Sequence, residues 1–344
     1  MKKNYAMLAF ATLMMAACAN NDLVDEGLVK EEVPQAIGFE EFVGKSTRGI
    51  NTTNLNDFHA GFGVWAYKGD AGSINTSVME NYNVVYDAGA ETKWIYKGKT
   101  GGTNGETVQT LKYWDKLKAY EFYAYAPYNK SVNIVSKDIQ ITKGQYAANE
   151  NLAGETLSTT EPEGTYSGDG NAATNKTTDW MIAAVISRAA NETSTVQEAF
   201  THTLSRLIVN LKSTTPENIT INSVSVNNVY GTGEFKNNQW SVTAGDKVNI
   251  PGATGTLVGK ETNPEIHYCM EYLLIPSTNK PTFSINYTIN DDTYNVENVD
   301  IEGIDNFLQN TCYELTVTIE VAAIKFSATN SIWATPTDGG VTID

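Results

Sequence analysis

The chain has 344 residues, of which 41% are hydrophobic and 19% charged, so it holds enough apolar material for one large domain or two of ordinary size. The 40 acidic residues against 24 basic ones give a formal net charge of −16, which argues against nucleic acid as a partner and against electrostatic attachment to an anionic membrane. Three His and three Cys leave little material for a metal site, while 18 Tyr with many Asn, Thr and Val favour strands.

The amino terminus is predicted to be a targeting segment, so residues 1–17 are assigned to a signal peptide. After a basic start, the apolar stretch Tyr5–Met15 is too short to span a bilayer. Met15-Ala16-Ala17-Cys18 resembles a bacterial lipobox, which predicts that Cys18 carries a lipid and becomes the first residue of the mature protein. The alternative is an ordinary signal peptide followed by a chance cysteine. Residues 18–35 are polar and acidic and are expected to form a flexible tether.

The body of the chain is predicted to be all-β, because strand patterns recur along it and amphipathic helix patterns are almost absent. In the strand expected over residues 58–67, Phe62, Val64 and Ala66 alternate with Trp65 and Tyr67, which places the two sets on opposite faces. Further features are expected as strands over 36–43, 83–86, 93–96, 113–114 and 119–126, a hairpin tip at 98–105, a long loop at 143–178, a buried central strand at 180–187 and a connection between domains at 188–194.

A second series of strands follows, in which the turn Asn290-Asp291-Asp292 separates the two strands of a hairpin. Strands at this spacing with polar turns predict two β-sandwich domains, the first over residues 36–194 and the second over residues 195–344. The strands of the second series are expected over 198–212, 218–230, 233–242, 266–276, 282–289, 293–299, 313–321 and 324–328, and from 331 to the end of the chain.

The sequence has no motif for catalysis, cofactor binding or metal binding, so an enzyme is not expected. His59, His202 and His267 lie in separate strand regions without ligand spacing and are expected to be structural. The turn at 290–292 and the loop at 168–171 contain residues that could ligate calcium, although turn formation is the favoured reading of such residues. A hydrolase with two carboxylates is an alternative that no motif supports.

Tryptophan and cysteine each leave two interpretations open. The tryptophans could stack on sugars, but in strands most are expected to fill the core; an exposed row would indicate a surface glycan-binding lipoprotein. Cys269 and Cys312 could pair in an oxidising compartment, whereas two buried free thiols are slightly favoured. The tryptophans are Trp65, Trp94, Trp114, Trp180, Trp240 and Trp333.

Five segments form an ordered set across nearly the whole chain. They are the lipobox at Cys18 with its acidic tether, the strand over 37–43 followed by Lys45-Ser46-Thr47-Arg48, the aromatic run from Tyr113 that ends in Tyr125-Ala126-Pro127, the segment Phe200–Leu207, and the ending from Asn310 to Ile319 with Ile324 and Trp333. Together these segments resemble the fimbrillins, which are the subunits of the type V pili of Bacteroidales.

The resemblance implies two tandem transthyretin-like, Greek-key β-sandwiches and a structural role in a fimbrium used for cell adhesion. Such subunits are exported as outer membrane lipoproteins and are then cleaved by an Arg-specific protease after their first strand. Here the cut would fall between Arg48 and Gly49, and Ile37, Phe39 and Val43 would belong to the removed strand. Its loss would open a groove that a strand of another subunit fills, which is β-augmentation.

The resemblance further implies that residues 331–344 are the donor strand. The implied partners are other fimbrial subunits, the Arg-specific protease and an unidentified surface receptor, and the implied location is the outer membrane and then the cell surface. Two alternatives are open: Arg48 as an ordinary polar residue at a strand end, and Gly339-Gly340 as a hairpin that closes the last segment on its own domain. The implied donor residues are Ile332, Trp333, Val341 and Ile343.

Overall fold

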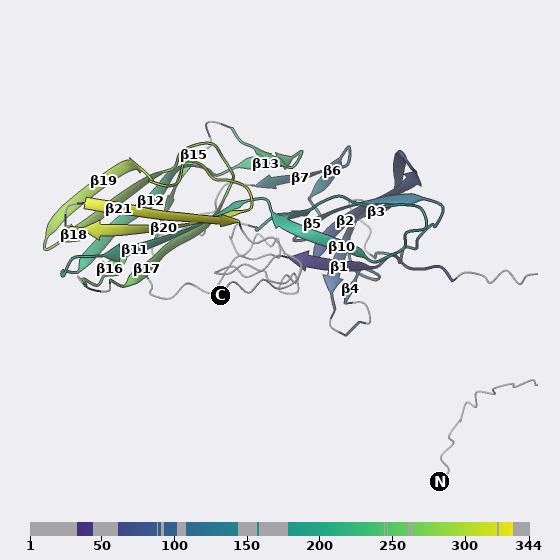
Figure 1. The fold of residues 1–344 in the computed structure, drawn as a ribbon, viewed down its shortest axis with the longest axis horizontal. Coiled ribbons are helices and arrows are strands. Elements are labelled where there is room, and N and C mark those ends of the chain that lie inside the picture. Colours follow the sequence, from purple (N-terminus) through teal and green to yellow (C-terminus); the bar gives the residue numbers. More distant parts are fainter. Residues whose placement is uncertain are drawn as a thin grey trace, which may run out of the picture. The chain divides into compact units, whose positions relative to one another are not determined.

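The fold is described from a computed structural model, in which the chain divides into residues 1–34 and a folded body over residues 35–344. All regular elements among the residues described are strands, which confirms the all-β prediction (Figure 1). None of them is a helix with the length and apolar character needed to cross a membrane. The described residues are 33–43, 61–87, 89–90, 93–101, 108–143, 157, 178–243, 245, 247–260, 262, 264–321 and 323–332.

The first half of the body is built on an eight-stranded sheet whose hydrogen-bonded pairings close on themselves. The strand order is β2-β3-β4-β1-β10-β8-β5-β9, and β5 also pairs with β2, so seven of the strands form a ring, as in a barrel. Figure 1 shows β1, in purple, between β10 and β4. The strands are β1 (Phe39–Val43), β2 (Phe62–Asp70), β3 (Ser73–Tyr86), β4 (Trp94–Ile95), β5 (Ala119–Ala126), β8 (Met181–Ala183), β9 (Ile186–Arg188) and β10 (Val196–His202).

Alternation along β2 separates two hydrophobic clusters, as expected from the two-residue period of a strand. Phe62, Val64 and Ala66 belong to the cluster that fills the barrel. Trp65 and Tyr67 belong to a different cluster on the other face. The predicted faces of this strand are therefore confirmed.

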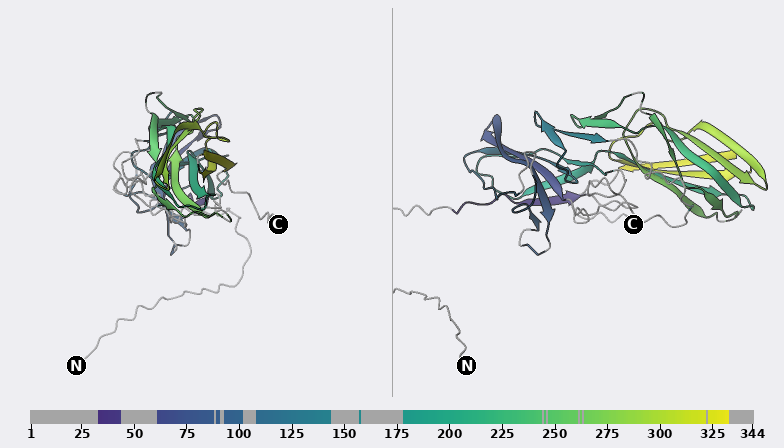
Figure 2. Two further views of the ribbon diagram at one scale, coloured as in Figure 1. Left: turned by 90° about the vertical axis from the view of Figure 1, so that its left-hand side faces the viewer. Right: turned by 180° about the vertical axis from the view of Figure 1, so that it is seen from behind.

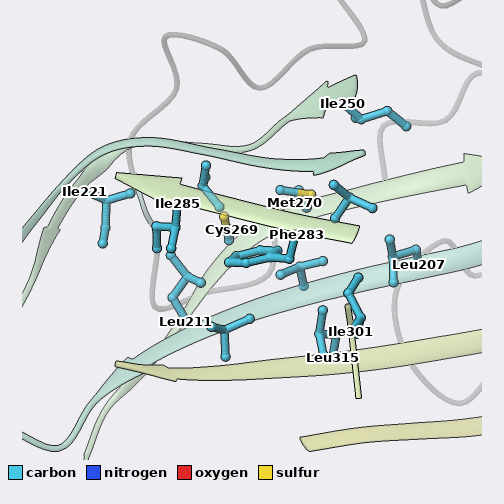
Figure 3. Close-up of a cluster of buried hydrophobic side chains, with 14 of the residues drawn as sticks. Leu207, Leu211, Ile221, Ile250, Cys269, Met270, Phe283, Ile285, Ile301 and Leu315 are labelled. Atoms are coloured by element: carbon cyan, nitrogen blue, oxygen red, sulfur yellow. The ribbon is translucent and has the colours of Figure 1, made fainter. Parts of the chain in front are cut away.

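The second half of the body is a sandwich of two sheets around one core (Figure 1, Figure 2). One sheet has the order β17-β11-β20-β21, and the other has the order β15-β12-β18-β19 with β16 beside β12. Leu207 and Leu315 from the first sheet meet Ile221 and Ile285 from the second in this core (Figure 3). The strands are β11 (Ser205–Ser213), β12 (Ile219–Tyr230), β15 (Lys247–Pro251), β16 (Gly255–Leu257), β17 (Ile266–Leu274), β18 (Thr282–Ile289), β19 (Asp292–Asp300), β20 (Thr311–Glu320) and β21 (Ala323–Ile332).

A small sheet joins the two halves, and we call it the clasp sheet. Its order is β14-β13-β7-β6, so a hairpin from the first half pairs with a hairpin from the second through β7 and β13. Phe235 of the clasp sheet packs in one cluster with Trp65 and Tyr125, which face away from the barrel core. The strands are β6 (Asn133–Val135), β7 (Asp138–Lys143), β13 (Gly233–Lys236) and β14 (Gln239–Ser241).

Three predicted strands differ from the structure because each is interrupted. The run over 233–242 forms β13 and β14, with a turn at Asn237 and Asn238 between them. The run over 180–187 forms β8 and β9 with a break at Ala184 and Val185, and Val185 is 52% exposed. The run over 198–212 forms β10 and β11, which are separated by Thr203 and Leu204. The amide and the hydroxyl of Thr203 both donate to the carbonyl of Trp180, at 2.8 and 2.9 Å.

The position of β10 also bears on the boundary expected at residues 194 and 195. Val196 and Phe200 of β10 point into the barrel core, and β10 pairs with β1 and β8. The chain therefore passes from the barrel to the sandwich after His202. The stretch expected to connect two domains, residues 188–194, instead links β9 to β10 within the barrel sheet.

The clasp sheet generates a prediction about stability. Replacing Phe235 by Ala should lower the free energy of unfolding by about 3–5 kcal/mol, because this ring is fully buried and its removal leaves a cavity. Denaturant unfolding of Phe235→Ala and of Lys236→Ala, an exposed neighbour on the same strand, measures the difference. A loss for Phe235→Ala no larger than the loss for Lys236→Ala would contradict this role.

Candidate functional site

The segment over residues 35–43, which we call the first-strand segment, contains the strand predicted to be removed. It is hydrogen-bonded on both of its sides. On one side β1 runs parallel to β10, from Phe39 opposite Val196 to Val43 opposite Phe200. On the other side the amide of Ile37 donates to the carbonyl of Lys112 at 2.9 Å, and Phe39 pairs with Trp94 of β4. The segment is thus an interior strand of the sheet and not an edge.

The inward side chains of the first-strand segment fill the centre of the barrel core. Ile37 is 1% exposed and Phe39 is 2% exposed. The ring of Phe39 meets those of Phe62, Tyr96 and Phe122 edge to face, with centroid distances of 6.1, 5.8 and 6.0 Å. Burying one such side chain contributes roughly 1.5–3 kcal/mol, so these two residues alone hold the segment firmly.

Polar contacts fix the register of the same segment. The hydroxyl of Tyr96 donates to the carbonyl of Ile37 at 3.0 Å, and burial raises the pKa of Tyr96 to about 12, so this donor keeps its proton near neutral pH. The side chain of Glu40 is exposed and accepts a hydrogen bond from Gln197 Nε2 at 3.1 Å. Ile37 and Phe39 of this segment therefore face the core, whereas Glu40 faces outward.

We call the surroundings of the first-strand segment its seat. The seat consists of the backbones of β10, β4 and residues 112–114 that face the segment, and of the aromatic rings that Phe39 contacts. Within the described part of the chain, β1 is the link that joins β4 to β10 in the ring of strands. Without it, the backbone donors and acceptors on that side of β10 have no strand partner, and the rings of Phe62 and Phe122 lose their cover.

Glu198 is an unexpected feature of this seat. It lies on β10 between Val196 and Phe200, with the same inward orientation, and its exposure is 0%. Neither carboxyl oxygen has a hydrogen-bond partner among the described residues. Burial raises the pKa of Glu198 to about 8, and the positive charge of Arg188 opposes the shift. The sequence analysis did not identify this residue. The signal that could have found it is an acidic residue two positions from both Val196 and Phe200, which places all three on the same face of the strand.

The opposite end of the chain provides an edge strand. β21 pairs with β20 and ends its sheet, so its other backbone side has no strand beside it in the described structure. Ile324, Phe326 and Ala328 pack against the sandwich core, whereas Ile332 at the end of the strand is 69% exposed. A long edge with one charged residue, Lys325, is a surface suited to pairing with another strand.

The predicted site residues fall into two groups. Ile37, Phe39 and Ile332 are placed as stated above, and Val43 is the last residue of β1. The lipidation, cleavage and remaining donor positions lie outside the described residues, so the structure does not test them. Those positions are Cys18, Arg48, Gly49, Trp333, Val341 and Ile343.

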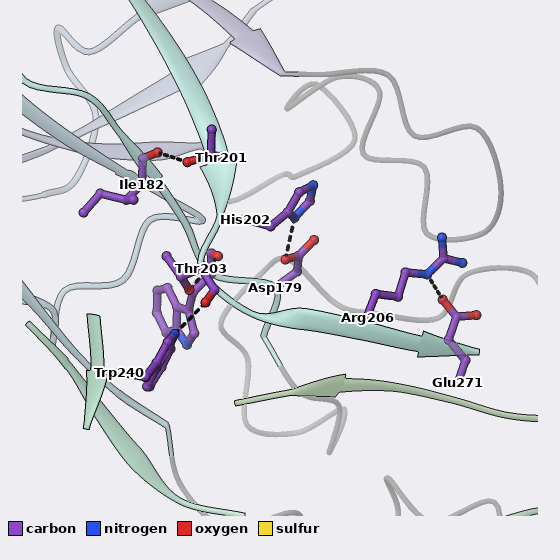
Figure 4. A network of polar contacts seen from close by, with 9 residues as sticks. Asp179, Ile182, Thr201, His202, Thr203, Arg206, Trp240 and Glu271 are labelled. Atoms are coloured by element: carbon purple, nitrogen blue, oxygen red, sulfur yellow. Dashed lines mark hydrogen bonds and ion pairs between the residues drawn. The ribbon is translucent and has the colours of Figure 1, made fainter. Parts of the chain in front are cut away.

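Polar groups cluster where the chain leaves the barrel for the sandwich (Figure 4). His202 Nδ1 lies 2.9 Å from Asp179 Oδ1, and both residues are buried. Trp240 Nε1 donates to the carbonyl of Thr203 at 2.6 Å. Further along, Arg206 Nε donates to Glu271 Oε1 at 2.6 Å in a buried ion pair. These contacts fix the junction between β10 and β11, which agrees with a structural role for His202.

The other candidate chemistries receive little support from the described residues. Trp65, Trp94, Trp114 and Trp180 are buried, as expected for core residues, and Trp240 is partly buried, so these five do not form an exposed row for sugars. Trp333 and His59 lie outside the described residues, and His267 is buried in β17.

The cysteines and the acidic turns can be placed as well. Cys269 and Cys312 are both free, and burial raises the pKa of the Cys269 thiol. Asn290 and Asp291 form the predicted hairpin turn with φ angles of 49° and 71°, which is the left-handed backbone that two-residue hairpin turns require. No group of three or more His, Cys, Asp or Glu in the described ranges is placed to hold a metal ion.

Comparison with known proteins identifies relatives. A family model described as fimbrillin-like matches residues 47–333. No curated protein matches the chain.

Solved structures from Bacteroides share the fold. A fimbrial protein from Bacteroides vulgatus is 18% identical with a TM-score of 0.59, covering 87% of this chain and 100% of that one. A candidate cell adhesion protein from Bacteroides uniformis is 16% identical with a TM-score of 0.53, covering 88% of this chain and 99% of that one. A further candidate cell adhesion protein, from Bacteroides ovatus, is 14% identical with a TM-score of 0.50, and the match covers 89% of this chain and 100% of that one.

The seat of the first-strand segment generates a stability prediction. Phe39→Ala should lower the free energy of unfolding by about 3–5 kcal/mol, because the cavity would lie at the centre of an aromatic cluster. Glu40→Ala, on the outward face, should change it by less than about 1 kcal/mol. Thermal or denaturant unfolding of the two variants measures the difference, and equal effects would contradict the described packing.

Glu198 generates a prediction about pH. Because its pKa is about 8 in the folded protein and about 4.5 in the unfolded chain, the folded state holds a proton that the unfolded chain releases between these values. The contribution of Glu198 to the free energy of unfolding is fully present below the lower of the two pKa values. It is lost as the pH rises towards the higher value, and the free energy of unfolding falls by no more than about 1.4 kcal/mol per pH unit. Denaturant unfolding between the two values should therefore show a steeper fall for the parent than for Glu198→Gln. Parallel profiles would contradict it.

Proposed function

The chain belongs to the fimbrillin-like family, and from this membership we propose that it is a structural subunit of a surface fimbrium that joins its neighbours by exchange of strands. The observation that carries the proposal is the first-strand segment. It is both an interior strand of the barrel and the first strand of the folded body. A single cut after it would therefore leave it held to the rest of the body by noncovalent contacts alone.

Arg48 is the proposed position of that cut, with Gly49 following it. The chain has three arginines, and the other two lie in strands: Arg188 at the end of β9, and Arg206 in β11, where it is 1% exposed. An Arg-specific protease therefore meets a chain in which two of its three targets are held in sheets. This distribution supports selective cleavage at Arg48.

Removal of the first-strand segment would open its seat to water. Ile37 and Phe39 each contribute roughly 1.5–3 kcal/mol by burial, and an open seat loses this together with the backbone hydrogen bonds to β10. An incoming strand regains both terms, which is the physical basis of β-augmentation. The opened barrel thus becomes an acceptor for a strand of another subunit.

The proposed donor is the segment 331–344 of a second copy or of a related subunit, with Ile332, Trp333, Val341 and Ile343 as its apolar residues. Ile332 ends an edge strand and is exposed, so the chain beyond it continues from the margin of a sheet and not from its interior. In the competing arrangement, Gly339-Gly340 turn this segment back onto its own sandwich.

Export precedes assembly in this proposal. Cys18 carries the lipid, the acidic tether spans residues 18–35, and the precursor is held at the outer membrane until the protease acts at the cell surface. The subunit has no enzymatic role, and its partners are other fimbrial subunits and a surface receptor. Adhesion is then a property of the fimbrium that the subunits build.

Cleavage is the direct test of the proposal. Treatment of the mature protein with an Arg-specific protease should yield multimers by size-exclusion chromatography, whereas Arg48→Ala should remain monomeric. A protein truncated after Ile332 should be cut at Arg48 but should form no multimers, because it lacks the donor. Cleavage of the parent at Arg48 without multimers, or multimers of the truncated protein, would count against strand exchange.

A further inference from the structure

We propose that the free edge of β21 pairs with the same edge of a second copy of this chain, antiparallel and centred on Phe326. Two sandwiches would then share one continuous sheet. The contact uses neither the seat of the first-strand segment nor the proposed donor. It therefore goes beyond strand exchange and would hold subunits side by side.

The length and exposure of its free edge distinguish β21 from most strands that end a sheet in the described structure. Four of those strands, β6, β9, β14 and β16, have three residues each, and β15 has five. β17 is longer, but it is buried except at Ile266. β21 has ten residues, with exposed positions along its whole length, and it lies beside β20 at the margin of its sheet (in yellow in Figure 1). A long exposed edge is a template for pairing with another strand.

The remaining long end strand, β19, has an edge that is protected against such pairing. Its register with β18 shifts, and Asn298 has a left-handed φ of 51°. Asp292, Glu297 and Asp300 add three exposed charges of one sign. Bulges and charges are features by which natural sheets prevent edge-to-edge pairing. β19 is therefore not expected to pair with another copy.

The edge of β21 lacks these protections. It pairs with β20 over ten residues without a register shift, and none of its residues is proline. Its one charged residue is Lys325, which forms an ion pair with Glu320. Because the whole chain has a formal net charge of −16, two copies repel each other least where their surfaces are neutral. The edge of β21 is such a surface.

The backbone of β21 leaves hydrogen-bonding groups free at alternate residues. Ala323 lies opposite Glu320 across a two-residue turn, and a turn of this length closes on a hydrogen-bonded pair. Every second residue from Ala323 onward therefore bonds to β20, because bonded and non-bonded pairs alternate in an antiparallel ladder. The residues whose amide and carbonyl groups point to the free edge are Ile324, Phe326 and Ala328.

The side chains of these three residues select the same centre of pairing. They are partly buried against the sandwich core, where the ring of Phe326 meets that of Phe283 edge to face at a centroid distance of 5.7 Å. Pairing centred on Phe326 places this ring beside that of its copy, and it places Ile324 opposite Ala328 of the second copy. Apolar side chains would thus cover each other along the joint.

The same centre keeps like charges apart and leaves the donor free. It places Lys325 opposite Ser327 of the second copy and not opposite Lys325. The paired stretch covers residues 323–329, so residues 331–344 can still serve another subunit. Because a contact of this length buries little area, it should be weak and reversible, and it should dissociate at the dilution of size-exclusion chromatography.

Sedimentation equilibrium of the mature Arg48→Ala protein over a range of concentrations tests the inference, because this protein cannot be cut at residue 48. We expect a reversible equilibrium between monomer and dimer. In that background, Ser327→Glu should tighten the dimer about fivefold and Ser327→Lys should weaken it by about the same factor, since two pairs with Lys325 form in each dimer. Ser327 is exposed, so both variants should fold.

Ser331→Glu and Ser331→Lys are the matched controls, because Ser331 is exposed on the same side of β21 but lies outside the paired stretch. They should change the dissociation constant by less than about twofold. A protein that stays monomeric at every concentration overturns the proposal, as does an equal effect of the two charges at position 327. Association that appears only after truncation at Ile332 would make the chain's own carboxyl-terminal segment the occupant of the edge, which also overturns it.

The test separates this inference from strand exchange. Because it uses uncleaved protein, its failure leaves strand exchange intact. Absence of multimers after cleavage would likewise leave the pairing of β21 intact.

Discussion

The barrel depends on the two-sided hydrogen bonding of one short strand. β1 joins β10 in parallel and β4 in antiparallel pairing, and it completes a ring of strands whose interior is filled by aromatic rings around Phe39. In a closed ring no backbone edge faces water, so loss of one strand exposes two edges and a hydrophobic floor together. Because β1 is also the first strand of the body, the element that completes the fold is the one that a single cut can release.

The second half of the body does not depend on β1 in this way. Its sandwich encloses a separate core, and the clasp sheet ties it to the barrel through β7 and β13, so opening of the seat need not disturb it. Its edge strand β21 leads to the carboxyl-terminal segment proposed as the donor. In the proposed assembly, one subunit would therefore offer an acceptor and a donor that differ from each other. Such heterologous contacts propagate from subunit to subunit and build a filament when they do not close into a ring.

Local patterns in the sequence predicted local structure well. The alternation of Phe62, Val64 and Ala66 with Trp65 gave the correct faces, and Asn290-Asp291 gave the correct turn, because both depend on residues close in sequence. Membership of a sheet was harder, since β10 and β11 are separated only by Thr203 and Leu204, yet long-range pairing assigns them to two different sheets and cores. The ring closure and the burial of Glu198 depend on the register between β1 and β10, which no single segment contains.

A structure of the assembled fimbrium tests most directly which strand occupies the seat. Electron cryomicroscopy of multimers grown from the protease-treated protein would show which chain lies between β4 and β10. We expect density there that continues from the carboxyl-terminal segment of a neighbouring subunit, with an apolar side chain in the place of Phe39. Density for residues 35–43 of the same subunit in that position would contradict it.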